Sequence, residues 1–192
     1  MGDANFLVFI AVAFVVATQL QFYFLGTAPF LGELGVQSKN MPAVMSIAQS
    51  AQVLATVYVA FHEKAVLGTL GFRWTLALGA AMWGLLYAVY AVGRPKGVVL
   101  AAQALHGMAY AFFIGIGFIY VNQAATADFS ASAQALLTVS LFGFGFFGGT
   151  QLTGAVMDAL KVEGKFRWRA IFLVPCVVVL AAAAALAALF RG

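Results

Sequence analysis

Apolar residues fill this chain in six long runs, and short stretches rich in polar residues and turn formers separate the runs. Crossing the hydrocarbon core of a bilayer takes about 20 apolar residues of α-helix. The runs are continuous and do not alternate with a period of two, so they predict membrane helices and not the strands of a barrel. The predicted spans cover residues 5–31, 41–61, 72–92, 98–121, 131–157 and 168–190.

The composition supports a membrane protein. Of the 192 residues, 64% are hydrophobic and only 8% are charged, which is too little polar surface to cover a soluble core. We therefore expect an all-α integral membrane protein in which residues 1–192 form a single bundle of six transmembrane helices in a lipid bilayer.

The basic residues are divided unequally between the two ends of such a bundle. No basic patch with interleaved aromatic residues is present, so nucleic-acid binding is not expected. With six spans, one end holds both termini together with Lys64, Arg73 and Arg191. The opposite end holds the other basic residues: Lys39, Arg94, Lys96, Lys161, Lys165, Arg167 and Arg169. The positive-inside rule places this second end in the cytoplasm.

Polar side chains inside the spans are the candidates for a solute site, because a polar group at that depth is costly unless it is paired or faces water. All acidic residues lie at span ends or in loops, so His106 is the one group inside the spans that could titrate near neutral pH. The substrate-binding candidates are Gln21, Gln49, Gln52, His106 and Tyr110.

The spacing of these candidates groups them on helix faces. Gln49 and Gln52 are three residues apart, and His106 and Tyr110 are one turn apart. Amides both donate and accept hydrogen bonds, which suits a polar, uncharged ligand with a ring. The nearby aromatic residues Phe22, Tyr23, Phe24 and Tyr110 could stack on such a ring. Equally, the amides could bond from helix to helix and hold the bundle together.

Glycines gather in the fifth span and predict close helix packing there, at Gly143, Gly145, Gly148 and Gly149. Cys176 is the one cysteine, so neither an intrachain disulfide nor a thiolate metal site is expected. No nucleophile–base pair, metal cluster or phosphate loop stands out, so the sequence indicates neither an enzyme, a catalytic residue, a metal site nor a cofactor.

Several short segments carry a family resemblance. Leu20-Gln21 is followed by Phe30-Leu31, residues 45–52 read MSIAQSAQ, and residues 106–113 read HGMAYAFF. Residues 131–134 (ASAQ) and the glycine-rich run ending at residues 148–149 follow. In this order the segments resemble the seventh, eighth, tenth and eleventh helices of the nucleoside:proton symporter family, within the major facilitator superfamily. The resemblance covers most of the chain but only the C-terminal six-helix half of a family member.

Departures from the family's motifs bear on mechanism. Gln52 stands where the eighth-helix motif ends in an acid, and Ala111 stands where the tenth-helix motif carries an aspartate. Phe24 replaces an asparagine and His106 replaces a tyrosine. The resemblance implies movement of a neutral, nucleoside-like solute, and the lost acids argue against proton coupling of the family's kind, unless His106 takes over the titrating role.

One six-helix half presents only one wall of a transport path. We therefore expect a homodimer, a pairing with a separately encoded N-terminal half, or docking as a non-transporting structural or assembly subunit of a larger membrane complex. The expected location is a bacterial inner membrane. Orientation stays open, because the family arrangement places the termini in the cytoplasm and the basic residues indicate the reverse.

Overall fold

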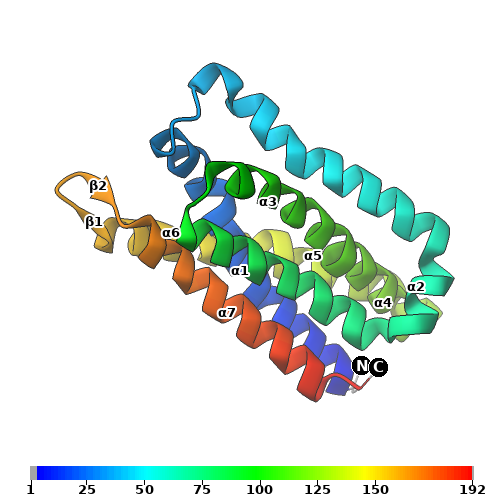
Figure 1. Ribbon diagram of the computed structural model, residues 1–192. Coiled ribbons are helices and arrows are strands. Elements are labelled where there is room, and N and C mark those ends of the chain that lie inside the picture. Colours follow the sequence, from blue (N-terminus) through cyan, green and yellow to red (C-terminus); the bar gives the residue numbers. More distant parts are fainter. Residues whose placement is uncertain (1–3, 192) are drawn as a thin grey trace.

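The structure is a computed structural model that describes residues 4–191, and most of these residues are helical. The helices are α1 (Ala4–Glu33), α2 (Met41–Val92), α3 (Lys96–Ala109), α4 (Ile116–Ala124), α5 (Ser130–Thr138), α6 (Phe146–Ala159) and α7 (Trp168–Leu189). They run side by side in an elongated bundle, and the two ends of the chain meet at the same end of it (Figure 1). There the backbone N–H of Arg191 donates to Asn5 Oδ1 at 2.8 Å.

A small hairpin projects at the other end of the bundle (Figure 1). Strands β1 (Lys161–Val162) and β2 (Lys165–Phe166) pair antiparallel, with Lys161 opposite Phe166. The turn between them uses positive φ at Glu163 and Gly164. Short 3₁₀ segments, Ser38–Asn40 and Ala127–Phe129, lead into α2 and α5.

Two π-helical segments interrupt the later spans. Tyr110–Gly115 joins α3 to α4, and Val139–Gly145 joins α5 to α6. Such segments widen one turn of an otherwise regular helix and are frequent at functional sites. The sequence predicted spans over 98–121 and 131–157 but did not indicate these π-helical turns within them.

Five helical stretches of the described chain are long and apolar enough to cross a membrane, whereas the sequence predicted six. The difference lies in α2, which contains both the second and the third predicted span. Its 52 residues would extend about 78 Å as one straight helix, far beyond a hydrocarbon core of about 30 Å.

The backbone of α2 leaves helical geometry at two residues, His62 (φ −121°, ψ 18°) and Gly71 (φ 67°, ψ 172°). Figure 1 shows α2 folding back on itself at one end of the bundle. The predicted break over 62–71 is therefore a short helical segment bounded by two residues with non-helical backbone, His62 and Gly71. Its Glu, Lys, Ala and Leu side chains favour helix, which explains why the chain stays coiled there.

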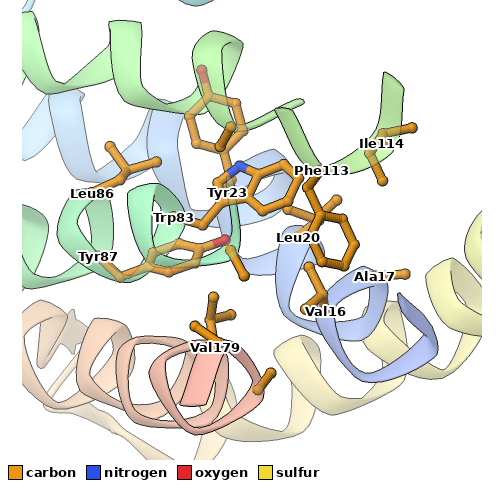
Figure 2. Close-up of a cluster of buried hydrophobic side chains, with 14 of the residues drawn as sticks. Val16, Ala17, Leu20, Tyr23, Trp83, Leu86, Tyr87, Phe113, Ile114 and Val179 are labelled. Atoms are coloured by element: carbon orange, nitrogen blue, oxygen red, sulfur yellow. The ribbon is translucent and has the colours of Figure 1, made fainter. Parts of the chain in front are cut away.

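Large buried side chains from α1, α2 and α7 fill the core. Trp83 of α2 lies next to Phe113, with ring centroids 5.7 Å apart, and Figure 2 shows both beside Leu20 and Tyr23 of α1. Nearer the hairpin end, Phe30 packs on Phe172 at 5.0 Å. This core packs α1 against α2 and α7, which also pack directly on each other, and so fixes the polar residues that α1 carries.

Candidate functional site

His106, near the end of α3, lies at the centre of the candidate site. Its ring stacks on Tyr23 of α1, with centroids 3.7 Å apart and planes 12° apart. Phe24 meets the same ring edge-on at 5.7 Å. From α2, Trp83 Nε1–H donates to His106 Nδ1 at 3.1 Å. Three helices thus hold the imidazole, and only 4% of the residue is exposed. We call these four side chains, His106, Tyr23, Phe24 and Trp83, the His106 group.

The hydrogen bond from Trp83 decides which imidazole tautomer is present. Since Nδ1 accepts a hydrogen bond from the indole N–H, the proton of the neutral imidazole resides on Nε2. A second proton on Nδ1 would face the indole N–H and break that bond. The arrangement therefore favours a neutral His106 that can donate through Nε2.

A second hydrogen bond fixes the ring beneath His106. Tyr23 Oη donates to Gln103 Oε1 at 2.6 Å, and Gln103 Nε2 lies 3.7 Å from Met45 Sδ. These contacts connect α1, α3 and the first part of α2. Tyr23 and Gln103 are both buried, so their pairing satisfies two polar groups that would otherwise be costly inside the bundle.

Gln21 lies on α1 against α6. A Cβ placed at Gly149 would come within 2.4 Å of Thr18 O and 2.9 Å of Gln21 Cγ, so the two helices touch there. Thr150 Oγ1 lies 3.2 Å from Gln21 Oε1 and 2.8 Å from the carbonyl oxygen of Phe146. The single hydroxyl proton is shared between two acceptors, so the Gln21 amide is only loosely held.

Gln49 and Gln52 lie on the first part of α2, beside α3. A Cβ at Gly107 would come within 2.0 Å of Ala48 O and 2.4 Å of Gln52 N, so this glycine lets the two backbones touch. Gln49 is exposed and Gln52 is half-buried. Within residues 4–191 no hydrogen bond joins Gln21 to either of them. The glutamines therefore border the His106 group from two helix pairs and do not form one cluster.

Aromatic rings form the exposed edge of the site. Phe24 is 46% exposed and lies 5.8 Å from Phe146 of α6, while Tyr110 is half-buried, 6.4 Å from His106. Of the four aromatic residues expected to stack on a ligand, Phe22 and Tyr23 are fully buried. Phe24 and Tyr110 keep ring surface available.

The glycines of the fifth span divide into two kinds. Gly145 and Gly149 face α1, and a Cβ at Gly145 would lie 2.7 Å from Ala17 Cβ. Gly143 has only Val139 of its own helix nearby, and Gly148 has nothing within 4 Å. Close approach therefore accounts for Gly145 and Gly149.

Trp83 is the site residue that sequence reasoning did not identify. A tryptophan inside an apolar span signals an N–H that needs an acceptor, but the sequence alone does not give the register that pairs it with His106.

In the described part of the chain, no group of three or more His, Cys, Asp or Glu residues could hold a metal ion.

Comparison with known proteins shows that the chain is similar in sequence to nucleoside transporters. The family model described as Nucleoside H+ symporter matches residues 1–192. The putative nucleoside transporter YegT of Escherichia coli (strain K12) is 28% identical over 165 residues, which cover 83% of this chain and 37% of YegT. The xanthosine permease of the same organism is 27% identical over 135 residues, covering 68% of this chain and 31% of the permease.

A solved structure gives the same fold. A mutant of the nucleoside transporter NupG superposes with a TM-score of 0.83 over 98% of this chain and 49% of its own, at 23% identity. The chain thus spans less than half the length of these relatives.

Proposed function

We propose that this chain, which belongs to the Nucleoside H+ symporter family, is one six-helix half of a transporter for a neutral, nucleoside-like solute. The relatives are named as transporters and permeases, not enzymes, which supports transport as the activity of this chain. Their occurrence in Escherichia coli supports a bacterial inner membrane as the location.

In this proposal α2 crosses the membrane twice. Its length, its irregular residues His62 and Gly71, and its fold-back all support a second and a third span joined by a tight corner (Figure 1). With the other four stretches this gives six spans, which match about half the length of the NupG chain.

One observation carries the proposed solute site: the open ring of Phe24 lies against His106, within the stack that Tyr23 and Trp83 fix. Stacking on aromatic rings suits a nucleobase, because every base has a π-face. Nε2–H of His106 would donate to a carbonyl or ring nitrogen, and the loosely held Gln21 amide would add a second polar contact.

Proton coupling is not part of this proposal. The candidate spans contain no carboxylate near the His106 group, since Gln52 and Ala111 occupy the places where the resemblance expects acids. The hydrogen bond from Trp83 favours the neutral form of His106. Solute would therefore move down its own gradient, and a protonophore should leave the initial uptake rate unchanged.

A second bundle must complete the path. Gln49, Thr150 and Gln151 are exposed on helices that would otherwise face lipid, and polar groups in hydrocarbon are costly. A second copy of the chain or a separately encoded N-terminal half would cover this wall and leave a polar route between the bundles.

The test is uptake of radiolabelled uridine into proteoliposomes or into cells that lack their own nucleoside transport. Gln21→Leu and Phe24→Ala should each lower the initial rate about tenfold, since one lost polar or stacking contact is worth roughly 1–3 kcal/mol. Gln123→Leu is the matched control, because Gln123 is exposed at the end of α4, outside the site. Equal rates for all variants at equal expression would refute the site.

A second function is favoured by the pairing of polar groups inside the bundle. Tyr23 with Gln103, and Trp83 with His106, need no ligand. The chain would then be a non-transporting structural or assembly subunit of a larger membrane complex. In that case Gln21→Leu and Gln49→Leu would alter only co-purification with the complex, and no nucleoside uptake would depend on the chain.

A further inference from the structure

An apolar groove runs between α2 and α7 on the outside of the bundle. The two helices touch closely where Gly84 faces α7, since a Cβ there would lie 2.4 Å from Leu180 Cδ2. Beyond this contact, toward the corner of α2, the facing surfaces of both helices carry mainly alanines, whose side chains are too small to fill the space. They leave a groove of about 450 Å³ with an almost wholly apolar lining, bordered by Trp74 and Leu78.

Arg73 stands at one end of this groove. Its Nη2 donates to the carbonyl oxygen of Ala187, and its guanidinium carbon lies 5.0 Å above the ring of Trp74. Ala187 and Trp74 both line the groove. A guanidinium has five N–H donors, and the bond to Ala187 uses one of them.

Capping of α7 explains only part of this arrangement. Ala187 belongs to the last turn of α7, where carbonyls lack helical partners and a cation is favourable. That role uses one donor of the guanidinium. The positive charge of Arg73 is also unmatched, because no carboxylate in the described part of the chain forms an ion pair with it. A cation with unused donors, at the mouth of an apolar groove, calls for a ligand with an anionic head and an apolar tail.

We propose that this groove binds one acyl chain of an anionic phospholipid, whose phosphate is held by Arg73. Charge-assisted hydrogen bonds from a guanidinium to phosphate are strong, and basic pockets between membrane helices bind anionic headgroups. The volume lies in the range of small-ligand sites, roughly 300–1,000 Å³. Trp74, 52% exposed, sits beside the cation at the groove wall, as aromatic residues do at headgroup level.

A lipid fits this groove better than a helix from another protein. A helix packing across α2 and α7 would bring small apolar side chains to the alanines but no anion to Arg73. A phospholipid supplies both the chain and the charge. The site is separate from the His106 group, so its test does not depend on transport.

The experiment is native mass spectrometry of the protein released from nanodiscs of phosphatidylcholine containing phosphatidylglycerol. We expect one retained phosphatidylglycerol. Ala184→Phe should abolish retention by filling the groove from an exposed position. Arg73→Gln should weaken it about fivefold, the effect of one basic residue beside anionic lipid. Ala181→Phe is the matched control, because Ala181 is exposed on the same helix but does not line the groove.

Three results would overturn the proposal. Ala184→Phe could retain the lipid as well as wild type does, or phosphatidylcholine could be retained as strongly as phosphatidylglycerol. Alternatively, Ala184→Phe could release a co-purifying polypeptide, which would make the groove a helix-docking face. If Arg73→Gln fails to fold, two comparisons still test the proposal: phosphatidylglycerol against phosphatidylcholine, and Ala184→Phe against Ala181→Phe.

Discussion

His106 shows how one residue takes its properties from its surroundings. The sequence marks it as a histidine inside a span, a position that fits a proton carrier as well as a hydrogen-bonding group. The structure gives it an indole donor at Nδ1 and a phenol ring stacked at 3.7 Å. These contacts favour the neutral ring, so in the proposed solute site His106 would donate through Nε2.

Trp83→Phe should destabilise the bundle by about 1–3 kcal/mol, because it leaves Nδ1 of His106 buried without a donor. Thermal unfolding in mild detergent measures this loss. Trp168→Phe is the matched control, since the buried Nε1 of Trp168 has no hydrogen-bond partner in the described chain.

A double variant separates this hydrogen bond from packing. With His106→Phe added to Trp83→Phe, no donor or acceptor remains unpaired at the contact. The combined loss should therefore be smaller than the sum of the two single losses by about 0.5–1.5 kcal/mol. Strictly additive losses would mean that the indole and imidazole do not interact.

At the scale of helices, contacts between backbones position the site. Gly107 allows α3 to touch the first part of α2, and Gly149 allows α6 to touch α1. Without these glycines the helices that carry Gln21, Gln52 and His106 would stand further apart.

Gly107→Ala should destabilise the bundle by about 1–3 kcal/mol, because the added methyl meets backbone atoms of α2 that cannot move alone. Gly115→Ala, in the same predicted span but with nothing within 4 Å, should be neutral or stabilising by up to about 1 kcal/mol. The same melting assay compares the pair. A harmless Gly107→Ala would show that α2 and α3 do not touch there.

The corner of α2 depends on Gly71, whose φ of 67° and ψ of 172° lie in a region that only glycine adopts readily. Gly71→Ala should therefore cost about 1–3 kcal/mol. Gly68→Ala, three residues earlier in helical backbone with open space around it, serves as its control and should cost nothing. Similar melting temperatures for the two variants would contradict a tight corner at Gly71.

The helical membrane fold could be predicted from the sequence, because long apolar runs are compatible with few other structures. The π-helical segments Tyr110–Gly115 and Val139–Gly145 could not be predicted, since an inserted residue leaves the apolar pattern of a span intact. The same limit applies to the site. His106 and Gln21 could be singled out as polar residues at depth, but Trp83 could not be paired with His106, because apolar runs fix no rotation of one helix against another.

At the scale of the whole molecule, the membrane-length helical stretches differ in how much of their apolar surface is buried. Only 22% of the apolar window in Ala127–Ala159 is buried, against 44–61% in the other stretches. This stretch also carries the exposed polar residues Thr150 and Gln151. Lipid would solvate its phenylalanines but not its amide, so the face of α6 is where a second bundle should lie.

Gln151→Cys tests that arrangement in a Cys176→Ala background, which removes the native thiol. If two copies pair through α6, mild oxidation in the membrane should give a disulfide-linked species of twice the 20.2 kDa chain. Val177→Cys, exposed on α7, should give none. A link to a different polypeptide would indicate a separate half or a larger complex. If Gln151→Cys stays unlinked, and gentle extraction yields single 20.2 kDa chains, then no second bundle covers this wall and the transport path proposed above does not exist.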